Sequence, residues 1–182
     1  MVPDGRRTAQ RAEVITAPVY LYDPPSPPRP TQIRRVEGSQ TIWTIPIPAE
    51  LSRQSAQLGL GGLWISLCPT GGVIAASACE TWQLNPETGE RLNSWPGELW
   101  TAQTDAVVLV TDRSRSFDAL DVFTFQATVV RATGPHAVTG QLSARPDCGG
   151  FDVLGLRWMR ETLRLSARDG CGLWTKRFGE TP

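Results

Sequence analysis

Four cysteines are the residues of this sequence whose type and spacing best suit covalent chemistry. Cys148 and Cys171 flank two strand-like runs, residues 151–159 and 162–167, at nearly mirror-image positions around residues 160–161. If the two runs form a hairpin that turns at 160–161, the two thiols face each other. A disulfide there would close a loop of roughly two dozen residues and stabilise the fold by about 3 kcal/mol through loop entropy.

Cys68 and Cys79 are the second candidate disulfide, with weaker support. A hairpin turning at residues 69–72 would place Cys68 opposite Val73 instead of Cys79. No close cysteine pair and no histidine cluster accompany these residues, so no zinc site or other metal is expected. The alternative is four buried free thiols. Because disulfides persist only where thiols are not kept reduced, the pairing predicts an extracellular, cell-surface or virion protein.

Asp112, Ser114 and Ser116 form an Asp-x-Ser-x-Ser motif directly after the apolar run 107–110. A carboxylate and two hydroxyls are the hard oxygen ligands that magnesium prefers. The motif resembles the metal motif of von Willebrand factor A domains, in which an amphipathic helix follows at once. Here residues 117–121 lead into another strand-like run. We therefore expect a polar loop at this motif and no metal.

Groups for acid–base chemistry are scattered. His136, the single histidine, follows Gly134-Pro135 in an expected turn, and no local context pairs it with a cysteine nucleophile. The carboxylate pairs Asp118 with Asp121 and Glu87 with Glu90 could come close enough for glycosidase chemistry, but both lie beside expected turns. The sequence therefore predicts a protein that is not an enzyme and needs no cofactor.

Seven tryptophans are a high number for 182 residues. Two or three of them on an exposed sheet face would form a platform for sugar rings or for a protein partner. Most lie in strand-like runs, which favours the core. Trp95 and Trp100, on either side of Pro96-Gly97, are the tentative binding residues because they are expected to be the most exposed.

Charge and hydropathy argue against a nucleic-acid ligand and a membrane span. Eighteen basic and eighteen acidic side chains balance, and the arginines are spread along the chain, so no nucleic acid is expected as a ligand. No apolar run approaches the length of a membrane span, and no secretory signal is visible at the N-terminus. If the protein is exported, we expect this chain to be a processed form.

Residues 1–30 are expected to form an extended N-terminal arm, because five prolines in residues 24–30 favour a polyproline-type spacer. The arm could reach a neighbouring subunit, act as a proline-rich ligand, or lie on its own domain. Residues 31–182 are expected to form a single β-rich domain.

Residues 81–95 contain the clearest hairpin signal, with Pro86 and Gly89 in the expected turn. The Trp, Asn-Pro and Thr-Gly pattern resembles one blade edge of quinoprotein-type propellers. Such propellers need several blades and the pattern occurs once here, so it predicts the hairpin alone.

The remaining runs predict an all-β fold. Strands are expected at 33–36, 41–47, 63–67, 73–76, 106–111, 122–130, 137–142, 151–159 and 162–167. One short helix is expected at 48–58, with proline in its first turn and Gly59 just beyond its end. Many short strands without crossover helices favour an antiparallel β-sandwich or barrel-like domain.

Three functions are compatible with these features. The first is a non-catalytic structural or assembly protein, such as a virion tail or capsid subunit or the soluble part of a surface filament, which contacts other protein subunits through the arm and forms oligomers. The second is a carbohydrate-binding or adhesive module that binds glycans with exposed tryptophans. The third is a hydrolase with dispersed carboxylates.

Overall fold

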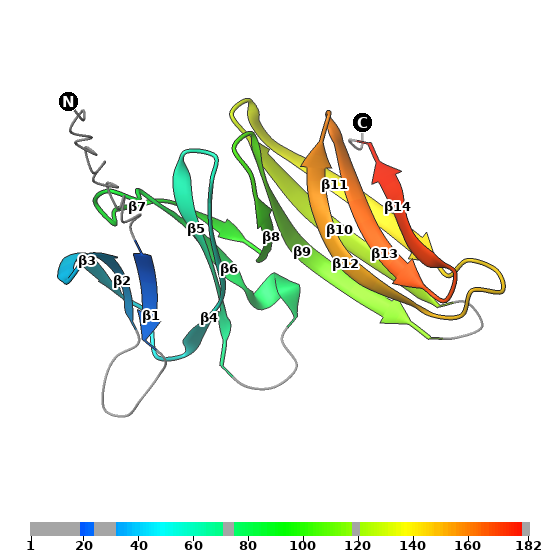
Figure 1. Cartoon of the computed structure of the whole chain (residues 1–182), viewed down its shortest axis with the longest axis horizontal. Coiled ribbons are helices and arrows are strands. Elements are labelled where there is room, and N and C mark those ends of the chain that lie inside the picture. Colours follow the sequence, from blue (N-terminus) through cyan, green and yellow to red (C-terminus); the bar gives the residue numbers. More distant parts are fainter. Residues whose placement is uncertain (1–18, 24–31, 71–74, 118–120, 180–182) are drawn as a thin grey trace, which may run out of the picture.

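The computed structural model of the chain describes residues 19–23, 32–70, 75–117 and 121–179. They form fourteen antiparallel strands and one short 3-10 turn (Figure 1). The elements are β1 Val19–Asp23, β2 Gln32–Glu37, β3 Gln40–Pro46, β4 Leu51–Gly59, β5 Gly62–Pro69, η1 Ala76–Ala78, β6 Glu80–Leu84, β7 Arg91–Pro96, β8 Glu98–Ala102, β9 Ala106–Ser116, β10 Val122–Arg131, β11 Gly134–Ser143, β12 Phe151–Met159, β13 Thr162–Asp169 and β14 Gly172–Phe178. The expected all-β antiparallel class is confirmed.

The strands make four sheets that pack one upon another. Their strand orders are β1-β2-β3, β4-β5-β6-β7, β11-β10-β9-β8 and β12-β13-β14. Three apolar clusters separate them: one between the first two sheets, one between the middle two, and the largest between the last two. Figure 1 shows the succession from the β1-β2-β3 sheet at the left to β12-β13-β14 at the right.

Strands β5 and β9 explain why the stack is continuous. In β5, Leu63 and Ile65 pack into the cluster beside the first sheet, while Trp64 packs into the middle cluster. In β9, Leu109 packs into the middle cluster and Val108 into the last. Successive side chains of a strand point to opposite faces, so an unbroken apolar run fits a strand that is covered on both sides.

The predicted helix at 48–58 is wrong: residues 51–59 form strand β4. The segment carries no helical stripe of apolar residues, and a helix this short is marginal without one. As a strand it pairs with β5, and its polar side chains reach β8. Ser55 Oγ donates to the carbonyl of Leu99, and the Gln57 amide accepts from the N–H of Ala102 at 2.8 Å.

Two further local predictions need correction. Of the expected hairpin of 63–67 with 73–76, residues 63–67 lie in β5, which pairs with β4 and β6, and Ala76 begins η1. Residues 73–74 lie outside the described part. The expected polar loop at Asp112–Ser116 is the second half of strand β9, which continues past its apolar half because β10 extends equally far.

The N-terminal arm is only partly described. Residues 19–23 form β1, which pairs with β2 of its own chain at the edge of the first sheet. The remainder of residues 1–30 lies outside the described residues. The expected contact between this arm and a partner subunit therefore stays a prediction.

Candidate binding surfaces

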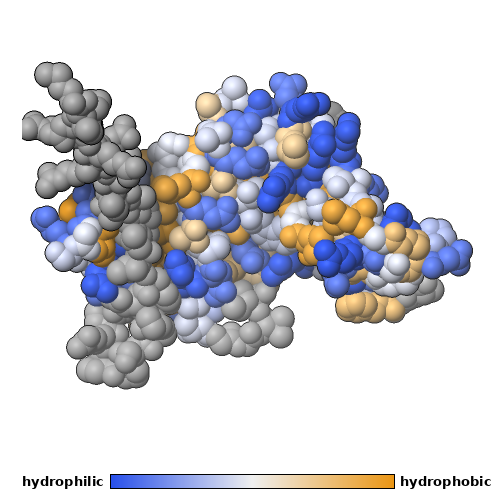
Figure 2. Space-filling view, viewed as in Figure 1, coloured by the Kyte–Doolittle hydropathy of each residue, from blue (hydrophilic) through white to orange (hydrophobic). Residues whose placement is uncertain are grey.

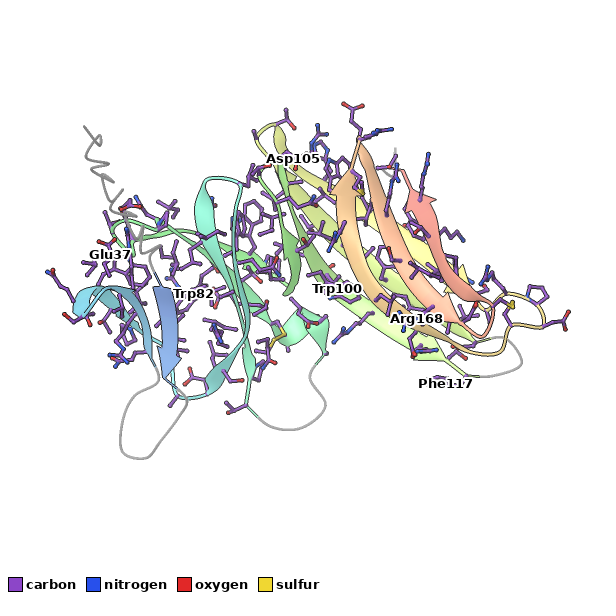
Figure 3. The ribbon with its side chains drawn as sticks, in the orientation of Figure 1. Glu37, Trp82, Trp100, Asp105, Phe117 and Arg168 are labelled. Atoms are coloured by element: carbon purple, nitrogen blue, oxygen red, sulfur yellow. A yellow bond between two sulfur atoms is a disulfide. The ribbon has the colours of Figure 1, made fainter. Side chains whose placement is uncertain are left out.

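The seven tryptophans are all buried or half-buried. Trp95 packs against the middle cluster, with its ring centroid 6.5 Å from that of Trp64. Trp100 packs against the last cluster, where the guanidinium of Arg113 lies 5.8 Å from its ring. Figure 3 shows Trp82 and Trp100 in separate parts of the interior. Trp95 and Trp100 share no cluster, so a binding role for them, which stays a prediction, would be separate for each.

Of the first carboxylate pair considered for acid–base chemistry, Asp118 with Asp121, the described member forms an ion pair. Asp121 accepts two hydrogen bonds from Arg115, at 2.8 and 2.6 Å, and one from the N–H of Phe151. The hydrogen bond from Arg115 lowers the pKa of Asp121. A general acid needs a raised pKa, so Asp121 is suited to an ion pair and not to proton donation. Asp118 lies outside the described residues.

Glu87 and Glu90 of the second carboxylate pair, and the single histidine, each lie in a different local environment. Glu87 accepts from Arg35 at 2.6 Å, and Arg35 also donates to the carbonyl of Pro86. Glu90 is exposed beside the β6–β7 turn. His136 lies in strand β11, opposite Val129, and not in a loop as expected, because the turn ends at Gly134.

Both predicted disulfides are present. Cys148 and Cys171 join the β11–β12 connection to the β13–β14 turn, and their Cα atoms are 5.2 Å apart. Cys68 and Cys79 continue the β5–β6 ladder by one step beyond its last pair, Leu67 with Glu80. The chain turns later than predicted, which places Cys79 and not Val73 opposite Cys68. Two disulfides indicate an oxidising, extracellular environment.

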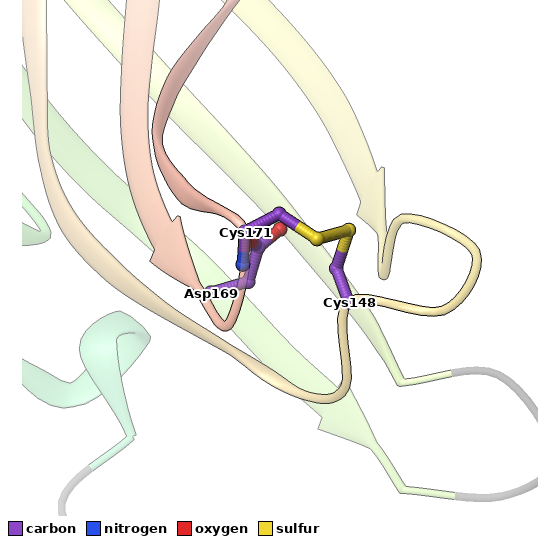
Figure 4. Close-up of side chains that lie close together, drawn as sticks. All are labelled: Cys148, Asp169 and Cys171. Atoms are coloured by element: carbon purple, nitrogen blue, oxygen red, sulfur yellow. A yellow bond between two sulfur atoms is a disulfide. The ribbon is translucent and has the colours of Figure 1, made fainter.

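Asp169 lies against the second disulfide (Figure 4). Its carboxylate and the two sulfur atoms are close enough to suggest a metal site, but the sulfur atoms are bonded to each other and cannot act as thiolates. Asp169 instead pairs with Arg145 and accepts from the N–H of Cys171. This Arg–Asp pair lies beside the disulfide. The sequence analysis did not predict it.

The outer face of the β12-β13-β14 sheet carries a row of arginines. Arg157 pairs with Arg164 across β12 and β13, and Arg164 pairs with Arg177 across β13 and β14. Their neighbours Leu156, Trp158, Leu163 and Leu165 are buried in the last cluster, so the three arginines point outward. In Figure 2 the side chains over this sheet are largely blue, with orange apolar residues between them.

A groove of about 570 Å³ lies where β10 and β11 approach β14. Gln126, Gln141 and Lys176 give it amide and ammonium groups, and Phe125 and Phe178 form an edge-to-face pair with ring centroids 5.1 Å apart. Gly140 allows that pair, because a Cβ atom there would lie 2.4 Å from the Phe125 ring. The groove offers hydrogen bonds around an aromatic surface.

Strand β3 is an open edge of the first sheet. Its sequence, Gln-Thr-Ile-Trp-Thr-Ile-Pro, contains no charged residue, and four of the seven are β-branched. Among the described residues no strand pairs with its outer side. Ile42 and Thr44 are exposed there. An uncharged, β-branched edge is a template for pairing with another chain.

Comparison with protein-family models, curated proteins and solved structures finds no match. In the described part of the chain, no helix is long and apolar enough to cross a membrane. The function has to be inferred from the surfaces themselves.

Proposed function

We propose that the protein is a non-catalytic structural subunit of an assembly on a cell surface or virion, and that it associates with further copies of itself through strand β3. The open β3 edge carries this proposal. Proteins commonly protect edge strands with charges, and β3 has none between Gln40 and Pro46.

A second copy is the occupant that suits this edge best. Two β3 strands related by a two-fold axis would pair antiparallel, each contributing the same side chains to the contact. The absence of charge in β3 removes the like-charge repulsion that such self-pairing would otherwise bring. Thr and Ile side chains also form favourable cross-strand pairs.

Sedimentation velocity of the full chain over a wide concentration range tests this proposal. We expect concentration-dependent self-association of the wild type. Thr44→Lys should abolish it by adding a charge to the edge, whereas Thr133→Lys, at another exposed position, in the β10–β11 turn, should leave it unchanged. A wild-type chain that stays monomeric at every concentration, or equal effects of the two variants, would overturn the proposal.

Carbohydrate binding is the second candidate. The groove beside β11 supports it better than the buried and half-buried tryptophans do. Gln126 and Gln141 could donate to and accept from sugar hydroxyls. Calorimetric titration with a panel of neutral oligosaccharides tests this candidate. Loss of any binding in Gln126→Ala, with binding kept in Gln54→Ala on the exposed surface of β4, would support it.

A further inference from the structure

Three arginines lie directly opposite one another across the β12-β13-β14 sheet. The register joins Arg157 to Arg164 and Arg164 to Arg177. Adjacent strands are about 4.8 Å apart, so the side chains start from a line about 10 Å long. Like charges directly opposite in a sheet are destabilising. The fold therefore tolerates an unfavourable arrangement at this place.

No described acidic residue neutralises the row. None of the three arginines forms an ion pair with a described residue, although acidic and basic side chains are equal in number over the whole chain. The Nε atom of Arg164 is buried and has no hydrogen-bond partner among the described residues. Trp82 and Trp95 also carry buried N–H groups without such a partner, so it is the unpaired charge of the three arginines, and not this atom, that favours a ligand on this face.

A shallow cavity of about 270 Å³ opens next to the row. Arg157 and Arg164 line it together with Ser166 and Thr175, whose hydroxyls can donate hydrogen bonds. Gly155 pairs with Ser166 in the neighbouring outward-facing row and contributes no side chain, which keeps the cavity open. Guanidinium groups beside hydroxyls are well suited to a multivalent oxyanion, because they can donate several charge-assisted hydrogen bonds.

Apolar side chains complete the surroundings. Leu154 and Met159 line the same cavity and are 52% and 44% exposed. They could contact the C–H faces of a sugar ring. The aromatic residues of this sheet, Phe151, Trp158, Trp174 and Phe178, pack against the cluster on its inner side. Single-stranded nucleic acids need exposed aromatic rings for base stacking, so this face suits them poorly.

We propose that the outer face of the β12-β13-β14 sheet binds a sulfated polysaccharide, with Arg157, Arg164 and Arg177 holding successive sulfate groups. Ser166 and Thr175 donate to the sulfate nearest the cavity, and Leu154 and Met159 contact the sugar ring. The disulfides indicate an extracellular environment, in which such polymers are accessible.

The site is independent of the proposed assembly. Strand β3 and the arginine face belong to opposite ends of the sheet stack (Figure 1), so each can be lost without the other. Failure of glycan binding would leave the sedimentation result unaffected, and a monomeric protein could still bind the polymer.

Calorimetry or surface plasmon resonance with a size-defined heparin oligosaccharide tests the site. Arg164→Gln is expected to weaken binding about tenfold, as the loss of a charge-assisted hydrogen bond predicts. The triple variant with Arg157, Arg164 and Arg177 all changed to Gln should weaken it at least about a hundredfold. Arg91→Gln, an exposed arginine on β7, should change affinity less than about twofold.

Stability gives a second readout. Because the row is self-repulsive, the triple variant should melt at or above the wild-type temperature. If it does not fold, the single exchange Arg177→Gln on the exposed edge strand β14 provides the binding test. Unchanged heparin affinity in a folded variant would overturn the proposal. Equal binding of the desulfated oligosaccharide, or tighter binding of duplex DNA, would also overturn it.

Discussion

Arg145 and Asp169 form a two-point ion pair beside the Cys148–Cys171 disulfide, with Nε–Oδ2 and Nη2–Oδ1 distances of 2.7 and 2.6 Å. The side chain of Asp169 has no exposed surface. The hydrogen bond from Arg145 lowers the pKa of Asp169 from 3.8 to about 2. The pair therefore couples the stability of the β13–β14 turn to pH.

Asp169→Asn should lower the melting temperature at neutral pH. A carboxyl whose folded-state pKa is depressed stabilises the fold fully above its unfolded pKa, and this contribution disappears as pH falls through the folded value. The difference between wild type and variant should thus be constant above about pH 4 and shrink between pH 4 and 2. Thermal melts across this range measure it. Asp105→Asn, in an exposed turn, is the control, and a pH-independent difference would contradict the expectation.

Removing either disulfide should destabilise the protein by about 3 kcal/mol. The bonds close loops with sequence separations of 11 and 23, so the double change Cys148→Ser with Cys171→Ser should cost slightly more than Cys68→Ser with Cys79→Ser. Urea unfolding with intact-mass analysis checks both values. A wild-type protein that unfolds at the same urea concentration with and without reductant would contradict a stabilising role for both.

Symmetry within the sequence explains which parts of the fold could be predicted. The turn at 160–161 correctly aligned the strands of the β12–β13 hairpin, and the same symmetry places Arg157 opposite Arg164. Arg177 joins them only through the next hairpin, which turns around Gly170 and Cys171. The spacing of the three arginines along the chain therefore did not predict the row, because the position of a charge cluster in a sheet depends on the register of the strands.

The failed prediction at 48–58 has a different cause. Proline before the segment and Gly59 after it are genuine helix-boundary signals, but they describe local preference alone. The backbone of β8 needs partners on that side, and Ser55 and Gln57 supply them from β4. These contacts cross more than forty residues of sequence, so no local pattern contains them.

Leu109→Ala should cost about 2–5 kcal/mol, as expected for a fully buried leucine. Leu109 lies in the cluster between the two middle sheets and has 0% exposure. Leu58→Ala removes the same atoms from a side chain that is 56% exposed and should change stability by less than about 0.5 kcal/mol. Urea titration of both variants measures the difference. Similar costs would mean that the middle cluster contributes little to the stack.

Gly89→Ala should destabilise the contact between the first two sheets more than a turn substitution alone can explain. Gly89 has φ +75°, and a Cβ atom there would lie 2.8 Å from the Trp43 ring. Gly38 has φ +59° and open space around it, so Gly38→Ala isolates the backbone cost, about 1 kcal/mol. The steric clash should add about 1–3 kcal/mol at Gly89.

A double-mutant cycle with Trp43→Ala separates the two costs at Gly89. Trp43 Nε1 also donates to the carbonyl of Pro86 at 3.0 Å, so its removal alone lowers stability. In the Trp43→Ala background the cost of Gly89→Ala should fall to that of Gly38→Ala, because the obstructing ring is gone. Equal costs of Gly89→Ala in the two backgrounds would show that a Cβ atom at Gly89 does not clash with the Trp43 ring.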